Sequence, residues 1–272
     1  MSISVNKYIP DGILNRLFLY LKTFGFIVFA TLLICACSGK QKSLNSDNDA
    51  TVVVTNSWTA AYAQAAGAEN IVILAPFEMA HPAEYELRPS DIPKLMKATV
   101  IVVAGYEVMM ERLKVGLDLP PDKLLPIKTD YNYANIEQSV MSLAVRLGTE
   151  SVARENLMEI RRAIEDGRQA LSEKGITQKA IVHHFHVPIA QELGLVPDVI
   201  FGPAAPEISD IVTVSKSDAV IIIDNSHNPV GQSFKEVLQG ARYKQFLNFP
   251  GMYGTKTLSD VIRYNVAQLV SE

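Results

Sequence analysis

The chain has 272 residues, of which 48% are hydrophobic and 20% are charged, and its formal net charge is −4. This composition excludes a disordered chain, because the apolar side chains suffice for a sizeable core of one or two domains. The mildly acidic balance provides no basic surface, so we expect no nucleic-acid partner. Both cysteines, Cys35 and Cys37, lie near the N-terminus, which excludes a disulfide framework and a cysteine zinc site farther along the chain.

The first 36 residues have the pattern of an export signal. Basic residues precede the uncharged apolar run 23–36, which is too short for an ordinary spanning helix and suits a signal-peptide core. The run ends in Ile34-Cys35-Ala36-Cys37-Ser38, which resembles a bacterial lipobox. We therefore expect a signal peptide over 1–36, a lipid on Cys37 and a polar tether over 37–50. An ordinary signal peptide or a short anchor helix is the alternative.

From Thr51 onward, short apolar runs alternate with helical patterns. Runs rich in β-branched residues predict strands, and apolar residues spaced three or four apart predict helices. Strands are predicted over 51–55, 71–74, 99–103 and 124–127, and helices over 58–66 and 90–96, the second capped by Ser90. This alternation is typical of βαβ units and of a mainly parallel sheet.

Two longer helices are predicted next. Apolar residues from Ile136 to Leu147 share one face of the first, which ends at Gly148. Thr149 is expected to cap the second, which runs from Glu150 to Glu173. About 24 helical residues span roughly 36 Å, which is long enough to link two lobes.

A second set of strands and helices completes the chain. Strands are predicted over 179–182, 199–201, 219–224 and 245–247, and helices over 188–193, 234–239 and 258–270. The expected fold class is α/β, with two lobes of mainly parallel sheet linked by a long helix and a ligand cleft between them. The expected boundaries are 51–148 for the N-terminal lobe, 149–176 for the interlobe helix and 177–272 for the C-terminal lobe.

Two histidines lie close after the ends of predicted strands, where a metal site is expected. His81 comes after the second strand, and His183 ends the strand over 179–182. Ligands of open α/β sheets bind at the carboxyl ends of the strands, and neutral imidazole is a common metal ligand. One histidine from each lobe is therefore a candidate to hold an ion in the cleft. A surface or capping role is the alternative for each.

The other histidines and a nearby acid have weaker patterns. An extended His183-His184-Phe185-His186 segment would place His184 and His186 on one face and His183 on the other, so not all three can bind one ion. His227 has the sequence setting of a turn residue. Glu84 flanks the His81 loop, where it would either orient an imidazole or be solvated.

Three segments resemble one known family, the zinc/manganese solute-binding lipoproteins of ABC transporters. They are His81-Pro-Ala-Glu-Tyr-Glu-Leu-Arg-Pro-Ser-Asp91, the segment HHFHVPIAQELGL over 183–195, and Ser259-Asp-Val-Ile-Arg-Tyr-Asn265. With the lipobox and the interlobe helix, the resemblance covers nearly all of the expected mature chain. It implies that His81 and His183 are metal ligands.

The sequence departs from the family at two positions. Asn132 falls where a second histidine is expected, and an amide oxygen is a harder ligand than imidazole. No clear counterpart exists for the late carboxylate ligand of the family. The substitutes are Asp130, Asn132, His184, His186 and His227. Asn132 and His186 from this set, together with Glu84, are the candidates for additional ligands or supporting residues.

The resemblance implies a function as well as a fold. It implies a monomeric lipoprotein, held at the periplasmic or extracellular face of the cell membrane, that delivers Zn²⁺ or Mn²⁺ to an ABC permease and its ATPase. Zn²⁺ is favoured where imidazole dominates, and oxygen ligands move the site toward Mn²⁺. The alternatives are a degenerate site that binds another solute, and a surface adhesin. A hydrolase is disfavoured, because no HExxH motif, phosphate loop or GxSxG elbow is present.

Overall fold

The computed structural model describes residues 50–117, 119–176 and 179–271. The expected signal peptide over 1–36, Cys37 and the tether up to residue 49 lie outside these residues. Within the described ranges, no helix combines the length and the apolar character needed to cross a membrane. All described residues fall within one compact unit, Ser46–Glu272.

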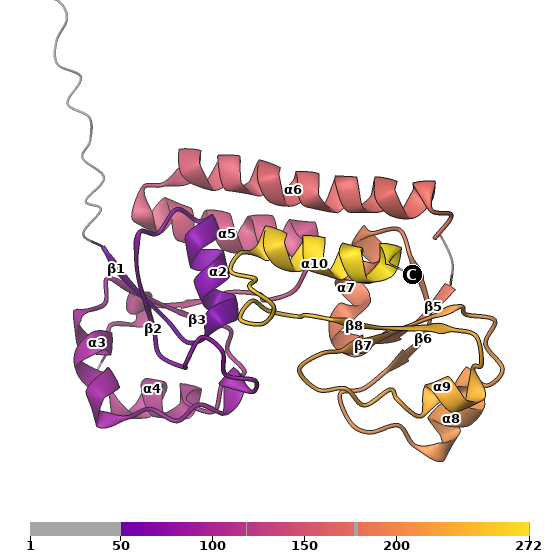
Figure 1. The fold of residues 1–272 in the computed structure, drawn as a ribbon. Coiled ribbons are helices and arrows are strands. Elements are labelled where there is room, and N and C mark those ends of the chain that lie inside the picture. The colour runs from indigo at the N-terminus through magenta and orange to yellow at the C-terminus, as the bar shows by residue number, and fades with distance from the viewer. Residues whose placement is uncertain (1–49, 118, 177–178, 272) are drawn as a thin grey trace, which may run out of the picture. The chain divides into compact units, whose positions relative to one another are not determined.

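The first sheet contains four parallel strands in the order β2-β1-β3-β4 (Figure 1). The central strands β1 and β3 are rich in valine and mostly buried, as expected for strands covered on both faces. The strands are β1 (Thr51–Val54), β2 (Asn70–Ile73), β3 (Val100–Val103) and β4 (Leu124–Pro126), and the accompanying helices are α2 (Ser57–Ala65), α3 (Ile92–Lys97) and α4 (Met110–Gly116).

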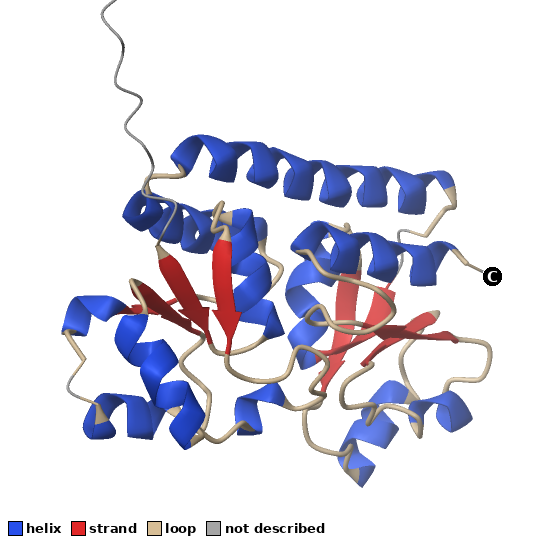
Figure 2. Cartoon of the chain, turned by 60° about the vertical axis from the view of Figure 1, so that its left-hand side comes forward, coloured by secondary structure: helices blue, strands red, loops and turns tan. Residues whose placement is uncertain are grey.

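The second sheet repeats this arrangement, with four parallel strands in the order β6-β5-β7-β8. The strands are β5 (Lys179–His183), β6 (Val196–Phe201), β7 (Ile221–Asn225) and β8 (Arg242–Phe246), and the helices are α7 (Val187–Glu192), α8 (Ile208–Val214) and α9 (Phe234–Val237). The two separate sheets are visible in Figure 2. They confirm the expected α/β class with two lobes of parallel sheet.

Three longer helices lie along one side of both sheets (Figures 1 and 2). They are α5 (Tyr133–Leu147), α6 (Glu150–Glu173) and α10 (Leu258–Val270). Helix α6 has the predicted bounds and extends over both lobes (Figure 1). It packs closely on α10, because a Cβ added at Gly167 would lie 2.6 Å from a methyl group of Val266. One hydrophobic cluster continues from the first lobe through these helices into the second, and each lobe has a further cluster of its own.

Of two predicted helix caps, Thr149 has the predicted N-cap position, and the cap at Ser90 is wrong. Thr149 occupies the N-cap position of α6, but its hydroxyl donates to the carbonyl oxygen of Ala66 at 2.5 Å instead of capping the helix. Ser90 lies inside a short 3₁₀ helix, Pro89–Asp91, that precedes α3. The Thr149 side chain makes a tertiary hydrogen bond in place of a capping bond, and Ser90 is part of a preceding helix.

Candidate functional site

A cavity of about 940 Å³ lies where the carboxyl ends of the strands of both lobes converge. Its lining comes from segments that follow strands in each lobe, as expected for open parallel sheets. Among the described residues, the lining includes no lysine or arginine, and its acids are Glu84 and Asp130. Three histidines line it: His81 from the first lobe, and His184 and His227 from the second.

His81 lies on the loop that follows β2. It is exposed and occupies the position before a short 3₁₀ helix, Pro82–Glu84, without capping it through its side chain. Its imidazole is therefore not committed to the local backbone. Glu84 is also exposed and lines the same cavity, three residues farther on.

The loop after β3 is held by a buried carboxylate. Glu107 is 3% exposed and accepts hydrogen bonds from the Thr55 hydroxyl at 2.5 Å and from the backbone N–H groups of Ala104 and Gly105 at 2.9 and 2.7 Å. These three bonds satisfy the carboxylate, so it is a structural element of the loop. The loop presents Tyr106 to the cavity.

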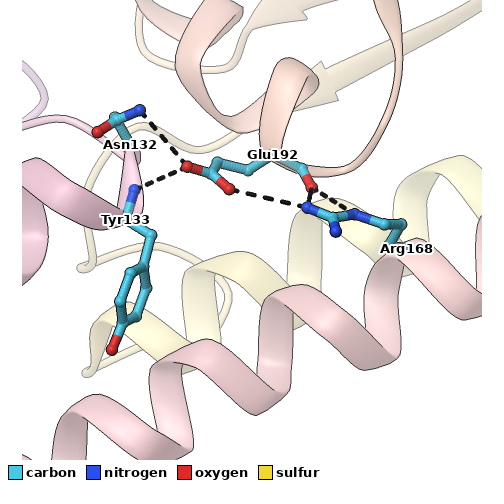
Figure 3. A network of polar contacts seen from close by, with 4 residues as sticks. All are labelled: Asn132, Tyr133, Arg168 and Glu192. Carbon is cyan, nitrogen blue, oxygen red and sulfur yellow. Dashed lines mark hydrogen bonds and ion pairs between the residues drawn. The ribbon is translucent and has the colours of Figure 1, made fainter.

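The segment after β4 places Asp130 at the cavity and Asn132 outside its lining. Asp130 accepts from the backbone N–H of Asn132 at 2.9 Å and from the side-chain amide of Asn135 at 2.7 Å. Asn132 caps α5, because its side-chain oxygen accepts from the backbone N–H of Asn135. Its amide group points toward Glu192 of α7 at 3.4 Å (Figure 3). A role for Asn132 as a metal ligand stays a prediction.

Glu192 joins three helices (Figure 3). Its carboxylate accepts from the backbone N–H of Tyr133 at 2.9 Å, at the start of α5. Its backbone oxygen accepts two bonds from the Arg168 guanidinium of α6, at 2.6 and 3.0 Å, and its carboxylate lies 3.8 Å from that guanidinium. The network therefore ties a helix of the second lobe to the interlobe helix and to the start of α5.

Replacing Glu192 with alanine is expected to lower the free energy of unfolding by about 1–2 kcal/mol, because the Tyr133 N–H loses a charged acceptor. Urea unfolding monitored by circular dichroism measures the change. Glu173→Ala is the matched control, since Glu173 accepts only an exposed bond from Gln169 of the same helix among the described contacts. Its effect should stay within about 0.5 kcal/mol. Equal losses in both variants would contradict the assignment.

His183 ends β5 but does not line the cavity. Its side chain is fully buried, its Nδ1 accepts from the backbone N–H of Phe185 at 3.3 Å, and its ring packs on the rings of Phe185 and Phe201. The structure therefore does not place His183 in the same lining as His81. Its assignment as a metal ligand stays a prediction.

The segment after β5 turns instead of staying extended. Residues His184–His186 form a 3₁₀ helix, so His183 and His186 both point into the core and His184 is exposed at the cavity. The predicted alternation of these side chains is therefore wrong. His186 is fully buried, packs against the ring of Phe246 and lies outside the cavity lining, with its ring centroid 6.0 Å from that of His183.

His227 lies on the cavity wall, two residues after β7. Its backbone N–H donates to the side chain of Asn225, and its ring stacks on Phe249 with centroids 3.7 Å apart. Within the described part of the chain, neither ring nitrogen has a hydrogen-bond partner, and neither has the side-chain oxygen of Asn248. Sequence reasoning named His227 only as one of five substitutes and did not name Asn248, although both residues follow strands of the second sheet, β7 and β8.

Burial keeps three imidazoles neutral. It lowers the pKa of His183 and that of His227 to about 4, and it lowers the pKa of His186 well below its ordinary value. For His227, the Asn248 side chain opposes this shift and the nearby charge of His81 adds to it. At neutral pH His227 therefore presents the uncharged form that binds metals.

These donors do not form a complete metal site by themselves. In the described ranges, no three histidine, cysteine, aspartate or glutamate side chains are grouped so that they could hold one ion. The chemistry of the lining nevertheless fits a divalent cation in part, because it combines imidazoles, two carboxylates and amide oxygens without a basic side chain.

The two sheets, the long connecting helix and the cavity at the strand ends define the two-lobed fold of periplasmic solute-binding proteins. A Mn-bound periplasmic metal binding protein from Candidatus Liberibacter asiaticus is similar, with a TM-score of 0.60 at 16% identity over 81% of this chain and 98% of that chain. Its Cd-bound form has a TM-score of 0.61 over the same shares, again at 16% identity.

The SBP FpvC from Pseudomonas aeruginosa, in complex with Ni²⁺, is also similar, with a TM-score of 0.62 at 16% identity over 81% of this chain and 96% of that chain. No protein-family model and no curated protein sequence matches the chain. The chain thus has the fold of these metal-binding proteins. At 16% sequence identity, the similarity shows the fold and nothing further.

Proposed function

We propose that the protein is an extracytoplasmic solute-binding protein that captures a divalent metal ion in the cavity between its lobes. The observation that carries the proposal is the pairing of His81 from the first lobe with His227 from the second in one lining. The similar folds that were solved with Mn, Cd and Ni support it. The role is binding and transfer, without catalysis.

His81 and His227 supply two nitrogen ligands in this proposal, and Asn248 and Asp130, which line the same cavity, are proposed as oxygen ligands. Two imidazoles favour Zn²⁺, while the amide and carboxylate oxygens also suit Mn²⁺. The proposed partners are an ABC permease and its ATPase, with a lipid on Cys37 holding the protein at the membrane surface. These partners follow from the sequence resemblance.

Isothermal titration of the metal-stripped mature chain with Zn²⁺ and with Mn²⁺ tests the proposal. We expect His81→Ala and His227→Ala each to weaken binding at least about 100-fold, because the loss of a direct ligand should exceed the 10–100-fold cost of losing a supporting residue. His184→Ala is the matched control, since His184 is exposed at the same cavity and is expected to leave affinity nearly unchanged.

Adding His183→Ala to the series distinguishes the ligand pair predicted from the sequence, His81 and His183, from the proposed pair, His81 and His227. Loss of binding in His81→Ala and His183→Ala, with His227→Ala unaffected, would restore the ligand pair predicted from the sequence. Absence of binding by the unmodified protein would overturn metal capture itself.

A further inference from the structure

We propose that the cavity binds its divalent metal as a complex with a small organic ligand, neutral or positively charged overall, in preference to the bare ion. This inference rests on the proposed function and specifies its substrate. Four features of the cavity carry it: its size, its shortage of donors, its charge and an unpartnered N–H group on its wall.

The cavity is much larger than a bare ion requires. Its volume of about 940 Å³ lies within the range of roughly 300–1,000 Å³ that is usual for small-molecule pockets. Much of the wall is apolar and suited to organic groups, with Phe185, Ile200 and Phe249 among its lining residues. A small molecule of several heavy atoms would fill space that an ion alone leaves to water.

The protein also supplies too few donors for a bare ion. His81 and His227 provide two imidazoles, and no group of three metal-binding side chains occurs in the described part of the chain. Zinc takes four ligands in closed protein sites, and Mn²⁺ takes about six. A bound organic chelator would contribute the missing ligands, while the two imidazoles complete the shell from opposite lobes.

The negative charge of the cavity lining disfavours metal complexes that carry a net negative charge. Its acids are Glu84 and Asp130, and no lysine or arginine lines it among the described residues. A complex with net negative charge would face these carboxylates without a compensating cation. A neutral or cationic complex avoids this repulsion.

A buried N–H donor in a cavity-lining residue favours a metal complex over a bare metal ion. The indole N–H of Trp58 and the side-chain oxygen of Asn248 are buried without hydrogen-bond partners within the described residues, and both residues line the cavity. An unsatisfied buried polar group costs about 1–3 kcal/mol. An organic ligand can offer an acceptor to the indole N–H, which a metal cation cannot do.

Trp58 also makes the test direct, because it is the only tryptophan of the chain and its fluorescence reports on the cavity. The metal-stripped protein is titrated with ZnCl₂, with the neutral 1:1 complex of zinc and iminodiacetate, whose three donors leave coordination positions open for the two imidazoles, and with zinc citrate as the anionic complex. We expect the neutral complex to bind at least about tenfold more tightly than zinc alone, and the citrate complex to bind more weakly than the neutral one.

The opposite order overturns the inference. If the protein takes up only the bare ion, iminodiacetate acts as a competitor and lowers the apparent affinity, and equal affinities likewise exclude a preference for the complex. In either case metal capture survives. Absence of binding in all three titrations overturns metal capture together with the inference.

Trp58→Phe provides a second readout, measured by calorimetry because the fluorophore is lost. It keeps an aromatic ring and removes the indole N–H. We expect weaker binding of the neutral complex and unchanged binding of ZnCl₂. A purely structural effect of the substitution would weaken both equally.

Discussion

Lowering the pH from 7 to about 4 is expected to remove on the order of 5 kcal/mol from the free energy of unfolding of the metal-free protein, which is comparable to the whole stability of many domains. The cause is the burial of three imidazoles: the pKa values of His183 and His227 fall from 6.5 to about 4 in the folded state, and that of His186 also falls well below 6.5. Each such group contributes up to about 1.4 kcal/mol per pH unit.

The direction follows from proton uptake. As the pH falls through 6.5, the unfolded chain protonates these imidazoles, while the folded protein keeps them neutral until about pH 4. The unfolded state therefore binds more protons throughout this window, and stability decreases as the pH decreases. Carboxylates with lowered pKa values, such as Asp91 and Asp260, lose their stabilising effect only below about pH 4.

Urea unfolding at half-unit steps between pH 7 and pH 4 measures this dependence. His186→Leu is the matched variant, because it removes a third buried imidazole whose pKa is also lowered. Its stability should fall less steeply over the same window. A stability that stays flat between pH 6.5 and pH 4.5 would show that the buried histidines are protonated without cost.

Replacing Gly202 with alanine is expected to destabilise the protein by about 3 kcal/mol or more. Gly202 follows β6 with φ at +75°, and a Cβ there would lie 2.5 Å from Nε2 and 2.6 Å from Cδ2 of His183. The left-handed backbone costs an L-residue about 1–2 kcal/mol, and overpacking adds about 1–3 kcal/mol. The imidazole cannot withdraw easily, because it is fully buried and packs on the rings of Phe185 and Phe201.

Gly148→Ala separates the two contributions. Gly148 has φ at +69°, and nothing lies within 4 Å of the position that a Cβ would occupy, so only the backbone cost of about 1–2 kcal/mol applies. Combining Gly202→Ala with His183→Ala should cost less than the sum of the two single changes, because the second substitution removes the clash. Equal losses for both glycines in urea unfolding would mean that His183 does not press on Gly202.

Local pattern predicted the longer helices well and missed some of the short ones. Helix α6 and helix α10 have the predicted bounds, because an apolar stripe repeated over several turns is a strong signal. Helix α4 and the extent of helix α8 were not predicted. Each has seven residues, and helices this short depend on packing against neighbours for their stability.

The candidate site was predicted only in part. The sequence rule that ligands bind at strand ends led to His81, which lines the cavity. The same rule led to His183, but the chain turns into a 3₁₀ helix directly after β5 and keeps that ring in the core. His227 has the local sequence of a turn, and its place on the wall depends on stacking against Phe249, which follows a different strand.

The α/β class and the long helix between two lobes can be predicted from the sequence, because strand and helix periodicities are local properties of the chain. Which imidazoles line the cavity together cannot be predicted in this way, because it depends on the packing of distant segments. That outcome depends on how loops from β2, β7 and β8, which lie far apart along the chain, are brought to one edge by the order of strands in two sheets. The 3₁₀ helix directly after β5 buries His183 and His186 and leaves His184 at the cavity. The local sequence does not predict that turn.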